Sequence, residues 1–162
     1  MKDQLKDLYI EQLRDLYNAE GQIVQNAPKM AEAAQNDDLR QACETHAQRA
    51  EQRRGRIAEI VEAHGEKASG VECKAMTGLM NEAKEHVLDA NLNEDVQDAA
   101  LIAQLQRVLH YELAGFGTVN TWSGSLDADR QSFFQSVLDE TYEADRMLTD
   151  LATRTVNQEA MA

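Results

Sequence analysis

Apolar side chains recur at helical spacing through four long segments of this chain, and this pattern limits the possible folds more than any other feature. In the first segment Leu5, Tyr9 and Leu13 begin a stripe with the i, i+3, i+4, i+7 spacing of one helix face. One proline and eight glycines are too few for the turns of a many-stranded fold. We therefore expect an all-α fold, with helices over about residues 2–35, 38–64, 72–90, 95–123 and 128–157.

The breaks between these segments carry residues that start and end helices. Pro28 lies inside the first segment, where it removes one backbone donor, so we expect a kink in one helix rather than two helices. Asn36, followed by two aspartates, is a suitable N-cap for the second helix, and Gly65 suits the position just past its end. Gly124 is expected to close the helix that begins near residue 95.

Residues 65–94 form a long connection that contains one shorter amphipathic helix. A bundle whose second and third long helices run parallel needs such a crossover to carry the chain back along its length. The 162 residues are enough for one domain with a real core and too few for two comfortable ones. The prediction is therefore a single domain over residues 1–162, a ferritin-like four-helix bundle with a short crossover helix between helices two and three.

The charge of the chain excludes some classes of partner. A formal net charge of −13 repels nucleic acid and anionic membrane surfaces, whereas it favours cations. No segment approaches the roughly 18 apolar residues of a membrane span, and the N-terminus lacks the apolar region of a signal peptide, so we expect a soluble, cytoplasmic protein. Cys43 and Cys73 are too few for a disulfide framework, and we interpret both as reduced, buried residues.

Several ionisable residues fall on the apolar stripes, where an unpaired charge is strongly disfavoured. At about 100° per residue, Glu20 points into the bundle from the first helix, and His46 and Arg53 lie near the centre of the second stripe. Glu112 lies among the apolar residues of the third long helix, and Glu140 lies nearer the edge of the last stripe. One candidate ligand therefore comes from each of four helices.

Two interpretations of this pattern stay open. Inward carboxylates and imidazoles in a bundle core can replace the water around a divalent cation, with Glu20, His46, Glu112 and Glu140 as the metal ligands. The other interpretation is a buried ion-pair network without a metal, in which a guanidinium takes the place of the cation. In that network Arg53, together with Arg49, would neutralise the carboxylates of Glu20 and Glu112.

Five runs of sequence resemble the YciF/YciE-like branch of the ferritin-like superfamily. The resemblance extends over nearly the whole chain and all the expected helices, and its C-K-A-M and H-Y-E-x-A-x-x-G-T runs are distinctive. The five runs are LRDLYNAE (13–20), CKAMTGLMNEAKE (73–85), DAALIAQLQRVLHYELAGFGT (98–118), LDETYEAD (138–145) and LTDLA (148–152).

The resemblance implies a four-helix bundle with a crossover helix, a homodimer, a link to bacterial stress responses and a di-iron carboxylate site, without an established activity. Glu20, His46, Glu112 and Glu140 stand where the family has metal ligands. Acids usual in the family are absent at three further positions, which are occupied by Arg49, Leu109 and Thr141.

These departures lead to the functional expectation. A di-iron site uses several carboxylates to offset the charge of two cations, and the three losses remove much of that charge. We therefore expect a stress-associated structural or interaction module with a degenerate metal site rather than an enzyme. The alternative is an oxidase or peroxidase-like protein that binds iron or manganese through the remaining ligands.

Overall fold

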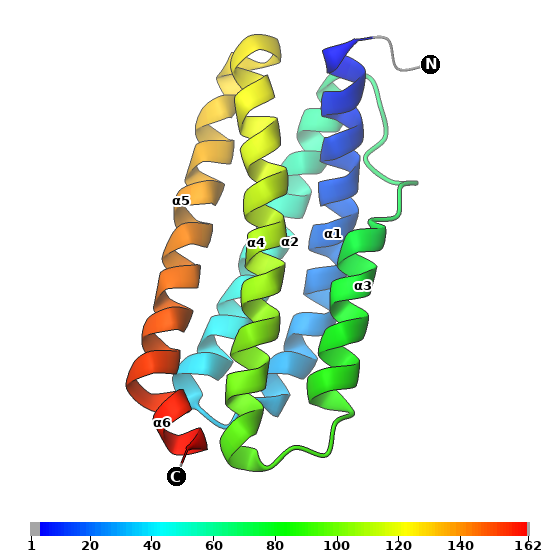
Figure 1. The fold of residues 1–162 in the computed structure, drawn as a ribbon. Coiled ribbons are helices and arrows are strands. Elements are labelled where there is room, and N and C mark those ends of the chain that lie inside the picture. The colour runs from blue at the N-terminus through cyan, green and yellow to red at the C-terminus, as the bar shows by residue number, and fades with distance from the viewer. Residues whose placement is uncertain (1–3, 162) are drawn as a thin grey trace.

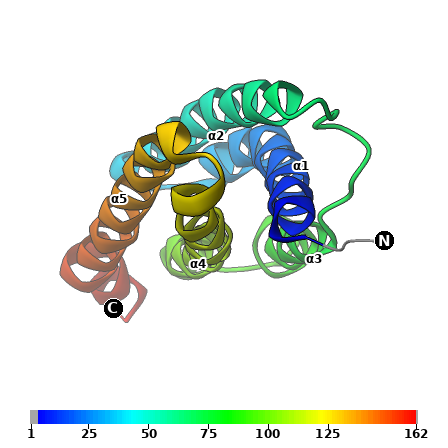
Figure 2. The same ribbon diagram turned by 90° about the horizontal axis from the view of Figure 1, so that it is seen from above.

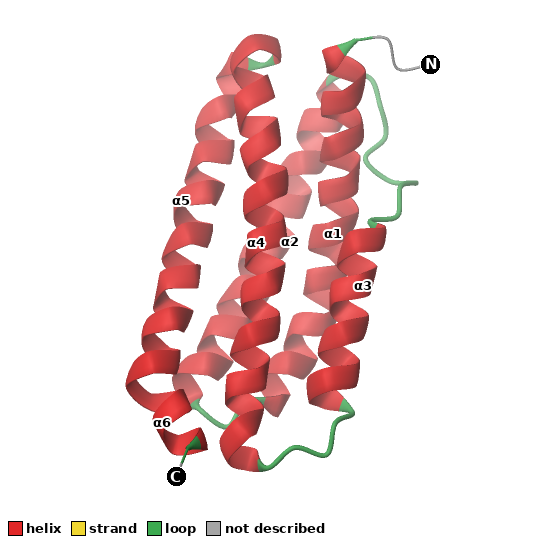
Figure 3. Cartoon of the chain, in the orientation of Figure 1, coloured by secondary structure: helices red, strands yellow, loops and turns green. Residues whose placement is uncertain are grey.

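The computed structural model describes residues 4–161, apart from the side chain of Asp95, and its architecture is an all-α bundle, as predicted (Figures 1 and 3). Within the described residues there is no strand, and no helix is long and apolar enough to cross a membrane. A shorter fifth helix, α3 (Lys74–Ala83), lies outside the four long ones. The long helices are α1 (Leu5–Ala33), α2 (Asp37–Ala63), α4 (Glu94–Leu126) and α5 (Ala128–Leu151).

Two helices, α3 and α5, continue into π-helical turns. α3 is extended by the turn Lys84–Leu88, and α5 by the turn Ala152–Val156 and then by the short helix α6 (Asn157–Ala160). With these extensions the observed helices agree with the predicted ranges to within a few residues at each end.

The connections create two antiparallel hairpins, α1 with α2 and α4 with α5 (Figure 1). α2 and α4 run parallel (Figure 1). The segment that connects them carries the chain back along the bundle, and its helix α3 packs against α1 and α4 (Figure 2). Gly65 and Gly70 lie in the loop before α3 with φ of +83° and +97°, a region that glycine adopts without steric cost. The predicted crossover helix is therefore confirmed.

Most of the expected helix boundaries are confirmed as well. The Asn36 side chain accepts hydrogen bonds from the backbone N–H groups of Asp38 and Leu39 and so caps α2. α1 continues past Pro28 as one helix. The expectation for Gly124 is wrong: it keeps a helical conformation without a positive φ, and α4 ends at Leu126.

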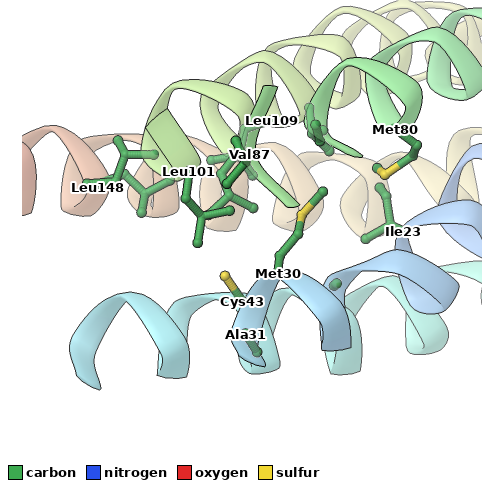
Figure 4. Close-up of a cluster of buried hydrophobic side chains, with 14 of the residues drawn as sticks. Ile23, Met30, Ala31, Cys43, Met80, Val87, Leu101, Leu109 and Leu148 are labelled. Atoms are coloured by element: carbon green, nitrogen blue, oxygen red, sulfur yellow. The ribbon is translucent and has the colours of Figure 1, made fainter. Parts of the chain in front are cut away.

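The apolar core consists of two clusters, one toward each end of the bundle. The first contains the ends of α1 and α4 that meet α3, and Figure 4 shows Ile23, Met30 and Leu101 converging there. The second surrounds Tyr9, Phe116 and other residues near the α4–α5 turn. Polar side chains enter the interior where the two clusters meet: Arg53 and Glu112 lie between the clusters along α2 and α4, whereas Glu20 and His46 lie among residues of the first cluster. This polar layer contains the residues singled out from the sequence.

Candidate functional site

The polar layer where the two clusters meet is formed by residues from all four long helices. Glu20 and Glu112 are fully buried, Arg53 is 3% exposed and His46 is 8% exposed. The Glu140 side chain, at 40%, lies at the edge of the bundle, as its position on the stripe predicts. The predicted burial of these side chains is thus confirmed, whereas their role as metal ligands remains a prediction.

Arg53 is the centre of this layer. Its Nη1 lies 3.0 Å from Oε1 of Glu112, and its Nη2 lies 3.3 Å from Oε2 of Glu140, so one guanidinium from α2 joins α4 to α5. The ring of Phe116 lies beneath it, with 5.9 Å from Cζ to the ring centroid. A half-exposed Arg49 lies farther out, with its Nε 3.8 Å from the same Glu140 oxygen. The predicted pairing of Arg53 with Glu112 is confirmed, and Arg49 contacts Glu140 instead of the two buried acids.

His46 approaches the network from the other side of Glu112. Its Nε2 lies 3.2 Å from Oε2 of Glu112, close enough for an ion pair but without the alignment of a hydrogen bond. Glu112 therefore has one oxygen directed at Arg53 and the other at His46. This arrangement places the carboxylate where a positive charge can stabilise its ionised form.

Glu20 has no cationic partner in direct contact, and neither of its oxygens accepts a hydrogen bond. Burial and the neighbouring Glu112 carboxylate together raise the pKa of Glu20 well above its usual value. Burial alone would also raise the pKa of Glu112, but His46 and Arg53 hold it below its usual value. A protonated Glu20 is itself a donor, and Oε2 of Glu112 has no other aligned donor. The raised pKa of Glu20 therefore favours its neutral form, and the lowered pKa of Glu112 favours its ionised form.

The three positions at which the resemblance led us to expect acids offer no carboxylate to a metal. Leu109 belongs to the apolar core, and the buried Thr141 donates its hydroxyl to the carbonyl of Val137 in the preceding turn at 2.7 Å. Arg49 brings a positive charge instead of a negative one. Among the described side chains, no group of three or more His, Cys, Asp or Glu residues is arranged to hold a metal ion.

A second polar cluster, which the periodicity did not reveal, fixes α3 against α1 and α4. The Asn18 side chain accepts a hydrogen bond from the backbone N–H of Cys73 at 2.8 Å, and the Gln22 side chain donates one to the backbone carbonyl of Cys73 at 3.1 Å. The Tyr111 hydroxyl lies 2.8 Å from Sγ of Cys73 and donates to Asp15. Asp15, Asn18 and Gln22 are spaced along one face of α1, and this spacing was the feature of the sequence that could have revealed the cluster. Both cysteines are free and buried, as expected, and burial raises the pKa of each thiol.

Asp98 is a further buried acid that the stripes did not single out. It is 6% exposed, and its two oxygens accept from the backbone N–H groups of Gln35 and Asn36 at 2.9 and 2.7 Å. It therefore ties the N-terminal part of α4 to the α1–α2 connection. Acidic residues are common near the start of a helix, where they usually face solvent. The burial of Asp98 could therefore not be inferred from its place in the sequence.

The fold and the polar layer define a class of protein: an all-α bundle of four long helices with a crossover helix and a buried, arginine-centred ion network. Residues 4–161 match the family described as Domain of unknown function (DUF892), and the chain belongs to this family. Protein YciF of Escherichia coli (strain K12) is 37% identical over 158 residues, which are 96% of this chain and 95% of the relative.

Two solved structures are similar over nearly their whole length. The crystal structure of the E. coli stress protein YciF has a TM-score of 0.89 at 36% identity, covering 96% of this chain and 98% of that one. YcfI from Rhodopseudomonas palustris, described as a candidate structural protein, has a TM-score of 0.84 at 36% identity and covers 91% and 94%. The resemblance to YciF inferred from the sequence is confirmed.

Proposed function

We propose that this protein is a structural or interaction module of the YciF-like stress proteins, in which Arg53 has taken the place of a metal at the bundle centre. The observation that carries the proposal is the position of the Arg53 guanidinium, between the carboxylates of Glu112 and Glu140 at 3.0 and 3.3 Å. A guanidinium has a fixed positive charge, and its planar donors suit carboxylate oxygens. It therefore supplies the charge and the contacts that a cation would otherwise supply.

The charges of the layer support this proposal. The carboxylates of Glu112 and Glu140 face the positive charges of Arg53 and Arg49, and the raised pKa of Glu20 favours its neutral form. A divalent cation would have to displace Arg53 or remove the proton from Glu20, and each step costs free energy in a buried site. YcfI of R. palustris is described as a candidate structural protein, which agrees with a role without turnover.

A second candidate function rests on Glu20. Two buried carboxylate oxygens without a donor are a reason to consider a cation, and His46 and Glu112 are nearby. In that case Glu20, His46, Glu112 and Glu140 would hold iron or manganese, which would act as a redox centre toward oxygen or peroxide. The donor set fits two metals poorly, because Arg53 and Arg49 occupy the same region as the acids.

Metal analysis separates the two candidates. The protein is purified without a chelating tag, its iron and manganese contents are measured, and iron is then titrated while the near-ultraviolet absorbance is followed. We expect far less than one equivalent of metal and no oxidation. Near-stoichiometric iron with oxidase activity, lost in Glu112→Gln, would contradict the structural role.

A gain-of-binding variant tests the role of Arg53 directly. If its guanidinium replaces the cation, Arg53→Met should bind Mn²⁺ or Fe²⁺ more tightly than the unaltered protein, and the metal should raise its melting temperature by mass action. Arg56→Met is the matched control, because Arg56 is exposed and its ion-pair partner among the described residues is Glu59 of the same helix. Equal metal affinity in both variants would show that Arg53 does not act as the internal cation.

The family resemblance also implies a homodimer in the cytoplasm, and we include both in the proposal. Light scattering of the purified protein over a range of concentrations measures the first. Fractionation of cells that produce the protein measures the second.

A further inference from the structure

On the side of the bundle away from α3, a groove of about 620 Å³ lies between α2 and α5. Two leucines of α4 lie along it, and residues of α2 and α5 form its walls. We name it the α2–α5 groove and define it by Ala42, Leu105, Leu109, Ala144, Met147 and Leu148. Its volume lies within the usual range of small-molecule sites, which are mostly apolar with a few polar groups at the margins.

Charged side chains stand at both ends of this groove, and most of them already have partners. Arg49 contacts Glu140, and Arg154 contacts Asp150 at 3.5 Å. Asp38 and Glu143 also line the groove, one from the start of α2 and one from α5, and no described cation lies within ion-pair distance of either. The charges without a partner at the groove are therefore both negative.

The two unpaired carboxylates lie toward opposite ends of the apolar surface. α2 and α5 run antiparallel (Figure 1). From their positions along these helices, Asp38 lies toward the Arg154 end of the groove, and Glu143 lies toward the end at which Arg49 contacts Glu140. Asp38 and Arg49 are eleven positions apart on α2, which corresponds to a length of about 16 Å. A ligand with a hydrocarbon body can cover the exposed apolar surface of Met147 while its head reaches an acid.

From these observations we propose that the α2–α5 groove binds a cationic amphiphile: an alkyl or aryl ammonium whose apolar body lies in the groove against Met147 and Ala144, above the buried leucines of α4, and whose head group lies at Glu143 or Asp38. The net charge of −13 favours the approach of such a cation. Burial of the hydrocarbon supplies affinity, and the unpaired carboxylates select the charge of the head group.

Three probes with the same chain and different head groups test this proposal. Octylammonium, octanol and octanoate are titrated below their aggregation concentrations, and binding is followed by calorimetry and by backbone amide shifts. We expect saturable binding of octylammonium, with shifts at the groove residues, and an affinity about tenfold higher than that of octanoate. Ethylammonium, which has the charge without the chain, should not saturate.

Variants at exposed groove positions assign the contacts without endangering the fold. Glu143→Gln and Asp38→Asn should each weaken octylammonium binding by up to about fivefold, and the double variant should bind octylammonium and octanol equally. Met147→Gln should weaken all three octyl probes, because Met147 is 51% exposed and offers apolar surface to the groove. Glu44→Gln, which removes an exposed acid of α2 outside the groove, should have no effect.

The opposite outcomes are equally defined. Absence of saturable binding, equal affinity for the three octyl head groups, ethylammonium binding as tight as octylammonium, or a Glu44→Gln effect as large as that of Glu143→Gln would each overturn the proposal. Metal content at the bundle centre is measured separately, so its outcome does not decide the outcome for the groove.

Discussion

Arg53 on α2 and Glu112 on α4 form the central ion pair of the bundle, with 3.0 Å between Nη1 and Oε1 and with both side chains buried. The pair lies between two apolar clusters, so the bundle is polar at its middle and apolar toward both ends. The attraction within a buried pair of this kind does little more than offset the cost of removing both charges from water, so the pair adds little to the free energy of unfolding. The loss of one partner, however, leaves the other charge buried and unpaired, which is strongly destabilising.

The first prediction follows from that asymmetry. Arg53→Leu should lower the free energy of unfolding by about 3–5 kcal/mol, because Glu112 then remains buried without its guanidinium. Denaturant unfolding at pH 7 measures this change. Arg53→Met combined with Glu112→Gln should recover at least half of the loss, since no ionised group is then left unpaired at the centre. Stability close to that of the unaltered protein in Arg53→Leu would show that the pair does not contribute.

The second prediction concerns pH. Because the pKa of Glu20 is raised in the folded state, the folded protein keeps a proton that the unfolded chain releases, and stability must fall as the pH rises from the ordinary carboxyl pKa toward the raised one. The slope for one proton is about 1.4 kcal/mol per pH unit. Glu112 has a lowered pKa, so its contribution is present above the ordinary carboxyl pKa and is lost at lower pH.

Glu20→Gln tests this assignment. The amide mimics the protonated acid and can donate to Glu112, so the variant should be more stable than the unaltered protein at pH 7 and should lose the downward slope above pH 5. Unfolding curves at several pH values provide the measurement. A variant with an unchanged slope would assign the proton to another group.

The third prediction concerns Asp98. Asp98→Ala should lower the free energy of unfolding by about 3 kcal/mol, because two backbone N–H groups at the α1–α2 connection lose a charged acceptor. Asp98→Asn keeps one acceptor oxygen and should cost about half as much. Glu85→Ala removes an exposed acid and should stay within about 0.5 kcal/mol of the unaltered protein. If all three variants unfold at the same denaturant concentration, Asp98 does not hold the connection.

The helices and the buried layer could be predicted because both follow from a single period. Glu20, His46 and Glu112 occupy core positions of their helices, and helical spacing alone places them inside. The choice of partners could not be predicted, because it depends on how far each helix is shifted along its neighbours. Arg53 pairs with Glu140 on α5 and does not contact Glu20 directly. The residue pattern of a single helix cannot predict this choice of partner.

Close approach between helices was equally hidden in the sequence. Helical spacing locates Leu16 in the core, but it does not reveal that Gly115 of α4 lies directly against it. A glycine inside a helix is ordinarily a weak position, since alanine is a better helix former. Only the packing of α1 on α4 distinguishes this glycine from its neighbour two residues on.

The fourth prediction uses that difference between two glycines of α4. A Cβ at Gly115 would lie 2.7 Å from Cδ2 of the fully buried Leu16, so this side chain would have to shift within the core, and Gly115→Ala should lower the free energy of unfolding by about 1–3 kcal/mol. A Cβ at Gly117 would meet nothing within 4 Å, so Gly117→Ala should raise it by about 0.5–1 kcal/mol through helix propensity. If α1 and α4 pack as closely as in the structure, thermal and denaturant unfolding should show changes in the free energy of unfolding of opposite sign for the two variants. Two stabilising substitutions would mean that the helices lie farther apart at Gly115, with room for the methyl group.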